Sequence, residues 1–313
     1  MSTSSHFTDR LAAAVRRCGT PVLVGLDPRA RQLPAGLKPD GSAGSWESLA
    51  AAYRTFCREV IDVVAPLVAA VKPQAAFFEQ LGPAGMVALA DVIRYGQQQG
   101  LLVILDGKRN DIGSTAAAYA EGWLGPGGQS AWGADALTVS PYLGDDSLAP
   151  FVEVAQQRGA GVFVLVKTSN PGGKMLQDLE AAGRPLYEHV AGHVEKLAAQ
   201  STGQSGYGVV GAVVGATYPD QLAELRHKMP HSWLLVPGFG SQGAAAQDVA
   251  GAFDKSGLGA IINSSRALIF AYSRDEYRDR YGESRWQAAV EAATRDMIDQ
   301  LRDQTPAGKL VEK

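Results

Sequence analysis

The sequence predicts a single (β/α)8 TIM barrel, in which eight parallel strands alternate with helices around one closed sheet. Three observations favour this fold. Short apolar runs alternate with segments of helical periodicity eight times along the 313 residues. The runs lack polar alternation, which is typical of parallel strands covered on both faces. No linker or internal repeat marks a second domain, so we expect residues 1–313 to form one barrel domain.

The strands are expected where the apolar runs fall. In chain order they are residues 22–27, 69–72, 101–106, 136–140, 162–167, 208–215, 233–237 and 259–263. Because each strand leads into a helical segment, a closed barrel is favoured over an open sheet.

The helices are expected between these strands. In chain order they are residues 46–65, 83–99, 114–122, 147–158, 178–200, 219–228, 242–254 and 284–302. An extra N-terminal helix over residues 7–15 precedes the first strand and is placed to cover the bottom of the barrel. Two insertions rich in Gly and Pro, residues 29–45 and 122–133, have no role that the sequence explains. The polar tail at about 303–313 is expected to be flexible.

The composition excludes several classes of protein. Hydrophobic residues make up 46% of the chain and charged residues 19%, as in ordinary globular proteins. The net charge of -3 gives no overall attraction to nucleic acid or to an anionic membrane. No apolar stretch reaches the length of a membrane span, and the first residues show no signal core. With only Cys18 and Cys57, we expect free thiols and a cytoplasmic protein.

The third predicted strand leads into the segment richest in chemistry. Its sequence, residues 101–116, is LLVILDGKRNDIGSTA. Asp106 and Lys108 are two residues apart, so they point the same way if the strand is regular. Taken alone, a pair of this kind is more often a surface ion pair. Asp111 follows the strand, and the spacing leaves open whether it reaches this site or that of a neighbouring subunit.

Polar residues also follow the other predicted strands. In a barrel, the residues at the carboxyl ends of the strands share one mouth and build the active site. The solubility of the chain does not explain why successive apolar strands end this way, so we predict a convergent site. Its further candidates are Asp27, Lys72, Ser140, residues 167–170, residues 237–243 and residues 263–266.

The last two strand ends predict an anion site. Gly238, Gly240 and Gly243 allow backbone N–H groups to approach a ligand, and a helix beginning near Gln242 would direct its positive end there. Arg266 adds a donor suited to phosphate. A tight turn alone would also explain the glycines.

The same glycines form the pattern of a dinucleotide-binding loop. Such a loop normally follows the first strand, with an acidic residue about twenty positions later. Here it follows the seventh strand, and the next strand ends in Asn263 and Ser264. Contact between Arg266 and the phosphate of NADP stays open as an alternative.

His189 and His193 have the spacing of metal ligands, but no third ligand accompanies them, so we expect no metal.

Together these motifs resemble the orotidine 5'-phosphate decarboxylase family. The segments that carry the resemblance are VGLDP at 24–28, VKP at 71–73, DGKRNDIG at 106–113, VKTSNPG at 166–172 and PGFGSQG at 237–243. The longer bacterial (type 2) branch is most similar, although Asn110 stands where that branch often has glycine. The resemblance covers roughly residues 7–300.

The resemblance implies decarboxylation of orotidine 5'-monophosphate to uridine 5'-monophosphate in pyrimidine biosynthesis, without a metal or organic cofactor. Lys108 would protonate C6 of the ring, held by Asp106, because a fixed cation stabilises the charge that develops there. The implied catalytic residues are Lys108, Asp106, Asp111 and Lys72. The implied substrate-binding residues are Asp27, Thr115, Ser169, Pro237, Gln242, Gly243 and Arg266.

The resemblance also implies a homodimer, in which Asp111 and Thr115 reach the partner's site. Two other functions stay open. A magnesium-dependent lyase or decarboxylase of keto-sugar phosphates would need another carboxylate at a strand end, where the second strand has Lys72. A non-catalytic nucleotide-binding protein would need Gly243 and Arg266 but could dispense with Lys108.

Overall fold

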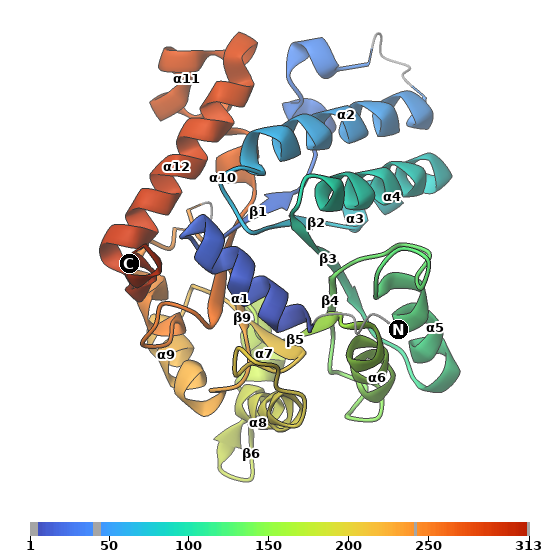
Figure 1. Cartoon of the computed structure of the whole chain (residues 1–313), viewed down its shortest axis with the longest axis vertical. Helices are drawn as coiled ribbons and strands as arrows, with labels where there is room; N and C mark the ends of the chain where they lie inside the picture. Colours follow the sequence, from blue (N-terminus) through green and yellow to red (C-terminus); the bar gives the residue numbers. More distant parts are fainter. Residues whose placement is uncertain (1–5, 40–44, 241–242, 312–313) are drawn as a thin grey trace.

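Eight parallel strands close into a barrel in the computed structural model, which describes residues 6–39, 45–240 and 243–311 (Figure 1). Around the barrel their order is β1-β10-β9-β8-β5-β4-β3-β2. Their bounds are β1 Val22–Leu26, β2 Ala70–Pro73, β3 Leu102–Arg109, β4 Ala136–Val139, β5 Gly161–Lys167, β8 Val210–Val214, β9 Leu234–Pro237 and β10 Ala260–Ser264. The predicted TIM barrel and the eight predicted strands are confirmed.

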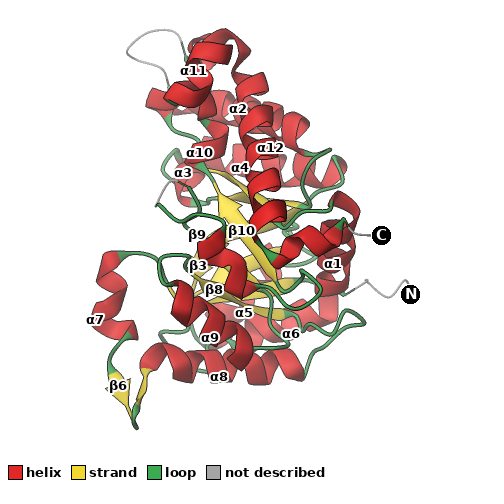
Figure 2. Ribbon diagram, turned by 90° about the vertical axis from the view of Figure 1, so that its left-hand side faces the viewer, coloured by secondary structure: helices red, strands yellow, loops and turns green. Residues whose placement is uncertain are grey.

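The helices surround the sheet, which occupies the centre of the molecule (Figure 2). Strands such as β1, β4 and β10 are buried along their whole length, because they pack on the barrel interior on one face and on helices on the other. The helices are α1 Phe7–Cys18, α2 Trp46–Val64, α3 Ala76–Glu79, α4 Gly82–Gln98, α5 Gly113–Trp123, α6 Ala149–Arg158, α7 Lys174–Gln177, α8 Leu186–Ala199, α9 Pro219–Lys228, α10 Arg266–Ile269, α11 Asp275–Tyr281 and α12 Trp286–Gln304.

Helix α1 covers the bottom of the barrel, as predicted. The ring of Phe7 packs edge-on against Phe163 of β5, with 6.1 Å between the centroids. The guanidinium of Arg10 binds Asp135, which directly precedes β4, at 2.6 Å. Because these partners lie at or near the amino ends of the strands, α1 leaves the opposite end of the barrel open.

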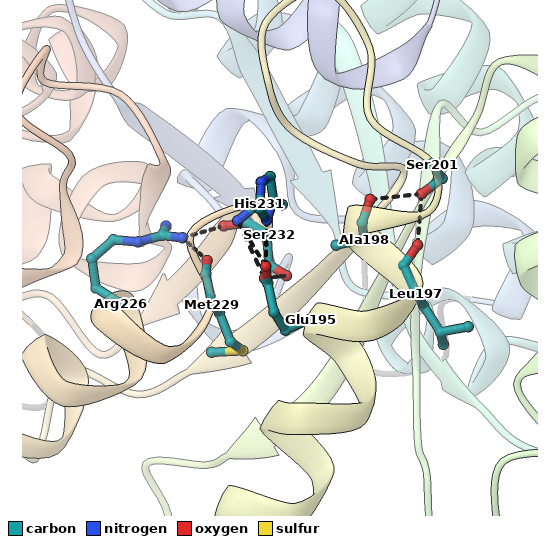
Figure 3. Close-up of polar contacts among 8 residues, drawn as sticks. All are labelled: Glu195, Leu197, Ala198, Ser201, Arg226, Met229, His231 and Ser232. Carbon is teal, nitrogen blue, oxygen red and sulfur yellow. Dashed lines mark hydrogen bonds and ion pairs between the residues drawn. The ribbon is translucent and has the colours of Figure 1, made fainter.

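A polar network closes the same amino-terminal end near β9 (Figure 3). The carboxylate of Glu195 accepts hydrogen bonds from His231 and from the hydroxyl of Ser232, the latter at 3.1 Å. The buried guanidinium of Arg226 donates to the carbonyl oxygens of Met229 and Ser232. These bonds tie α8 and α9 to the turn that enters β9, so this end of the barrel is a structural base.

The predicted helix 178–200 is wrong over its first eight positions. There the chain forms a hairpin of β6 (Glu180–Ala181) and β7 (Arg184–Pro185), and α8 begins only at Leu186. The reason is local: Ala182 and Gly183 adopt positive φ in the turn, and Pro185 lacks the N–H that a continuing helix needs. The hairpin and α7 project away from the barrel (Figure 2).

Two other predictions at the C-terminal end of the chain are corrected. Instead of an α-helix over 242–254, the structure has a 3-10 helix, η4 Gln247–Ala252. Gly251 lies so close to α9 that a Cβ there would be 2.6 Å from the Cβ of Ala223, and glycine favours the α-helix weakly. Within the tail that was expected to be flexible, Pro306–Leu310 form the 3-10 helix η7, in which Ala307 and Leu310 are buried. No helix in the described ranges is long and apolar enough to cross a membrane.

Candidate active site

A pocket of about 500 Å³ opens at the carboxyl ends of the strands. Its floor is formed by apolar side chains of β5, β8 and β9, namely Leu165, Val213 and Leu235. Polar side chains form the walls: Lys72, Asp106, Lys108, Thr138, Thr168, Ser169, Asn170 and Gln177. A pocket that combines apolar side chains with convergent polar groups is typical of a small-molecule site. The structure therefore brings together the ends of β2, β3 and β5, as the sequence predicted.

The carboxylate of Asp106 is the centre of the polar wall. Its Oδ1 accepts hydrogen bonds from Lys108 Nζ at 2.6 Å and from the Thr138 hydroxyl at 2.9 Å. Its Oδ2 accepts one from Lys72 Nζ at 2.8 Å. Three donors thus fix the orientation of one carboxylate, and two of them are charged.

The electrostatics of this cluster favour its charged form. Burial alone would raise the pKa of Asp106, but the ammonium groups of Lys72 and Lys108 hold that pKa well below its ordinary value. Burial likewise disfavours the charge of Lys72, but the carboxylates of Asp106 and Asp27 raise its pKa above the ordinary value. Lys72 and Asp106 are therefore a buried ion pair that supports the more exposed Lys108.

The backbone of Lys108 is left-handed, with φ 44°, which is unusual for a residue other than glycine. The pairing of β3 with β4 shifts register between Leu105 and Arg109. The strand is therefore irregular here, and simple alternation does not bring Lys108 beside Asp106. A conformation of this kind costs roughly 1–3 kcal/mol and persists where the surroundings enforce it. The shared site of Asp106 and Lys108 was predicted correctly, but its geometry was not.

Thr138 is a site residue that the sequence reasoning missed. Besides donating to Asp106, its hydroxyl oxygen accepts a hydrogen bond from the backbone N–H of Lys108 at 3.0 Å. The available signal was a polar residue between Leu137 and Val139 in an apolar strand. Thr138 therefore positions both members of the Asp106 and Lys108 pair.

The segment after β5 forms one side of the pocket. Ser169 and Asn170 line it, as does Gln177 at the end of α7. The amide of Gln177 binds Thr168 twice, at 3.0 Å to the backbone N–H and at 2.7 Å to the hydroxyl. Gln177 was missed because it lies just beyond the VKTSNPG motif at 166–172. Lys167, expected at the same strand end, is buried elsewhere in an ion pair with Asp178.

Asp27 lies directly after β1, where its charge acts on Lys72. Its Oδ1 is buried and has no hydrogen-bond partner among the described residues. A buried acceptor without a donor is costly, so a hydroxyl group of a ligand would stabilise it. Asp27 is therefore placed to bind a ligand next to the lysine.

Asp111 and Thr115 lie outside the described lining of the pocket. The carboxylate of Asp111 accepts a hydrogen bond from the N–H of Ile112 at 2.9 Å, just before α5. Thr115 is exposed in the first turn of α5. Within one chain, the structure does not bring these two residues to Lys108.

The loop after β9 has the backbone that its glycines predicted. Gly238, Gly240 and Gly243 all have positive φ, and Pro237 lines the pocket. Gln242 lies outside the described residues. Among the described residues that follow, 243–246 are not helical, and the first helical segment is η4.

Arg266 is exposed at the first residue of α10. A Cβ on Gly240 would lie 3.4 Å from the Cβ of Ala267, so the glycine loop packs beside the start of α10. The two predicted parts of the anion site are therefore neighbours. Over the described ranges, no group of three or more His, Cys, Asp or Glu side chains is arranged to hold a metal ion.

Comparisons with known proteins agree on one family. The profile of the "Orotidine 5'-phosphate decarboxylase / HUMPS family" matches residues 20–279. The orotidine 5'-phosphate decarboxylase of Rhodopirellula baltica is 59% identical over 298 residues, which cover 95% of this chain and 99% of the relative. That of Deinococcus radiodurans is 45% identical over 257 residues, covering 82% and 86%.

Solved structures of similar proteins have the same fold. A putative orotidine-monophosphate-decarboxylase from Toxoplasma gondii matches with a TM-score of 0.80 and 31% identity, covering 99% of both chains. A putative orotidine 5'-phosphate decarboxylase from Streptomyces avermitilis matches with a TM-score of 0.79 and 36% identity, covering 97% of both chains.

Proposed function

Because this chain belongs to the orotidine 5'-phosphate decarboxylase / HUMPS family, we propose that its pocket binds orotidine 5'-monophosphate and that Lys108 donates the proton to C6. The reaction, decarboxylation to uridine 5'-monophosphate in pyrimidine biosynthesis, follows from the family and from a relative 59% identical over 95% of the chain. The enzyme is a carboxy-lyase. The observation that carries the mechanism is the 2.6 Å contact between Lys108 Nζ and Asp106 Oδ1.

In the proposed mechanism, the bond between C6 and the carboxyl carbon breaks, and its electron pair stays on C6. Carbon dioxide leaves, and a proton moves from the Lys108 ammonium to C6. Lys108 then recovers a proton from solvent. A fixed cation beside C6 stabilises the developing charge without reorganisation of its surroundings. Asp106 would face the departing carboxylate, so that a repulsion between like charges disappears as the reaction proceeds.

The remaining polar groups are assigned to the rest of the nucleotide. The unpartnered Oδ1 of Asp27 and the ammonium of Lys72 would contact ribose hydroxyls, and Ser169 would contact the pyrimidine. Pro237, Gln242, Gly243 and Arg266 would hold the phosphate end. Such remote binding energy can hold the reacting groups in place and thereby raise turnover.

We assign Asp111 and Thr115 to the active site of a partner subunit in a homodimer. Asp111 lies just before α5 and Thr115 lies in its first turn, and the nearby large apolar side chains Ile112 and Tyr119 are exposed. Tyr142 and Leu143, after β4, are exposed as well. Exposed large apolar side chains beside Asp111 and Thr115 support a contact between subunits at this end of α5. A role in pyrimidine biosynthesis and the free thiols Cys18 and Cys57 support a cytoplasmic location.

The cluster of Lys72, Asp106 and Lys108 disfavours the two alternative functions. A magnesium-dependent enzyme acting on keto-sugar phosphates needs another carboxylate at a strand end, where β2 has Lys72 in an ion pair with Asp106. A non-catalytic nucleotide-binding protein has no use for a lysine held in a strained backbone conformation beside a buried carboxylate.

The proposed function is tested with purified protein treated with a chelator. Orotidine 5'-monophosphate should be converted to equal amounts of uridine 5'-monophosphate and carbon dioxide, identified by chromatography and gas analysis. Turnover that requires added magnesium, or turnover of sugar phosphates alone, would overturn the proposal.

A further inference from the structure

Arg109 joins three elements directly beside the strained residue Lys108. Its guanidinium forms an ion pair with Glu79 of α3 and donates a hydrogen bond to the carbonyl oxygen of Gly107 at 3.1 Å. The same group lies over the rings of Tyr119 and Trp123 of α5, at 5.7 and 5.5 Å from their centroids. The side chain is therefore held on several sides, and it holds the backbone of β3 in turn.

The hydrogen bond to Gly107 acts on the peptide group that precedes Lys108. This peptide is fixed at both ends, because Gly107 O accepts from Arg109 and Lys108 N donates to the Thr138 hydroxyl at 3.0 Å. Beyond Lys108, the carbonyl oxygen of Arg109 accepts from the N–H of Ser140 at 2.9 Å. A left-handed residue between such fixed groups keeps its conformation only while they stay in place.

The insertion 122–133 begins inside α5, which ends at Trp123, and its remaining residues, 124–133, support Arg109 through Trp123. Trp132 stacks on Trp123 with 4.4 Å between the ring centroids and an angle of 24°. Backbone bonds hold residues 124–133 and the following Ala134 against the end of α5: Trp132 N donates to Gly122 O at 3.1 Å, and Ala134 N donates to Trp123 O at 2.9 Å. Contacts therefore run without a break from Trp132 through Trp123 and Arg109 to the peptide before Lys108.

We propose that Arg109 is a positioning residue that holds Lys108 in its left-handed conformation beside Asp106, and that the insertion 122–133 supports Arg109 through the stacked Trp132 and Trp123. The inference rests on the proposed role of Lys108 as proton donor. It gives the insertion a function that the motifs do not explain. The guanidinium itself touches no reacting atom, and it acts through the backbone.

The first test replaces Arg109 by Gln and by Lys. Arg109→Gln removes the charge and the planar guanidinium that stacks on Tyr119 and Trp123, so Lys108 should be displaced and kcat should fall by at least about tenfold. Small displacements of a catalytic group can cost up to about 10²-fold in rate. Affinity for uridine 5'-monophosphate should stay within about twofold, because this ligand does not need the proton donor in place. Arg109→Lys keeps the charge opposite Glu79 and should recover part of kcat.

The matched control is Arg58→Gln. Arg58 also stacks on an aromatic ring, that of Tyr95 at 4.0 Å, and it also pairs with a carboxylate, that of Asp91, but on the outer helices α2 and α4. Arg58→Gln should leave kcat unchanged. Activity is expressed per folded site, counted by binding of uridine 5'-monophosphate, so a loss of stability alone does not lower the measured kcat.

The second test addresses the insertion. Trp132→Ala should lower kcat on the order of threefold while the affinity for uridine 5'-monophosphate stays unchanged. Trp132→Phe, which keeps a stacked ring, should restore kcat.

A crystal structure of Arg109→Gln shows the conformation of Lys108 directly. Lys108 should leave the left-handed region, and the distance from its Nζ to Asp106 Oδ1 should exceed the present 2.6 Å.

The outcomes separate this inference from the proposed function. If Lys108→Ala abolishes turnover while Arg109→Gln has the wild-type kcat and an unchanged Lys108 backbone, the positioning role is refuted and the proton donor stands. If Lys108→Ala retains turnover, the proposed function itself fails. A fall in kcat for Arg109→Gln that is matched by Arg58→Gln would also refute a specific role.

Discussion

Lys108 Nζ lies 2.6 Å from Asp106 Oδ1, although the two residues do not belong to one regular strand. The lysine returns to the carboxylate through a left-handed backbone, and Lys72 binds the other oxygen of the same group at 2.8 Å. The pair is therefore built by strain, by a buried counter-charge and by the hydroxyl of Thr138 together. Each of these contributions can be removed separately.

Thr138→Val removes the hydroxyl that binds both Asp106 and the N–H of Lys108. Because a hydrogen bond to a charged group contributes about 1.5–3 kcal/mol, we expect kcat to fall by about tenfold or more. Thr138→Ser keeps the hydroxyl and should retain most of the activity. The steady-state kcat of the two variants, measured with orotidine 5'-monophosphate, checks this. Equal activity in wild type and Thr138→Val would show that this hydroxyl does not position the pair.

In the acid range, the free energy of unfolding should depend on pH because of Asp106. Its pKa is lowered in the folded state, so its contribution is fully present above the unfolded value of about 3.9 and is lost as the pH falls toward the folded value. The pKa of Lys72 is raised, so its contribution is present below about 10.4 and is lost as the pH rises through the folded value.

The measurement is the free energy of unfolding in urea as a function of pH. The double variant Lys72→Met/Asp106→Asn removes both charges of the buried ion pair together, so it should fold and should lose stability less steeply below about pH 4 than the wild type. Asp299→Asn, which removes an exposed carboxylate paired with Arg302, is the control and should behave as the wild type. An identical acid dependence in the double variant and the wild type would exclude Asp106 as a contributor.

Arg266→Ala should weaken binding of the phosphorylated product. Loss of a charge-assisted contact to phosphate should lower the affinity for uridine 5'-monophosphate by about 10- to 100-fold. Uridine, which lacks the phosphate, serves as the control ligand, and its affinity should not change. Calorimetric titration of both ligands distinguishes the cases, and an equal loss for both would mean that Arg266 supports the pocket rather than the phosphate.

Mixing two inactive variants tests the shared site. If Asp111 completes the site of a partner, a dimer of one Lys108→Ala chain and one Asp111→Ala chain contains one intact site. Random exchange makes half of the dimers mixed, so activity should recover to about a quarter of the wild-type value. Each variant alone should stay inactive, as should a mixture of Lys108→Ala with Lys108→Ala/Asp111→Ala. No recovery after demonstrated subunit exchange would place Asp111 outside the partner's site.

The barrel could be predicted from the sequence because its strands are short, apolar and regularly spaced. The errors fall where a single residue overrides a pattern. Pro185 ends the helical pattern that begins at residue 178, and Gly251 packs against Ala223 where a helix was expected. Leu310, in a polar tail, is buried because η7 packs beside residue 255, whose carbonyl oxygen accepts from Lys309 at 3.0 Å.

The site was predictable to the extent that its residues occur in strand-end motifs. Lys72, Asp106, Lys108, Ser169 and Pro237 do, and they line one pocket. Thr138 and Gln177 do not: Thr138 contributes through a hydrogen bond to Asp106, 32 residues away, and Gln177 lies beyond the strand-end motif and reaches back to Thr168. The strained conformation of Lys108 could not be predicted either, since it depends on how β3 pairs with β4.

The central claim is that Lys108 delivers the proton that completes decarboxylation. The most direct measurement follows the ultraviolet change as orotidine 5'-monophosphate becomes uridine 5'-monophosphate, with chelator-treated wild type and Lys108→Ala side by side. We expect rapid conversion by the wild type and a loss of at least about 10³-fold in Lys108→Ala, with the circular dichroism spectrum and melting temperature of a folded barrel in both. Comparable turnover by a well-folded Lys108→Ala protein would contradict the claim.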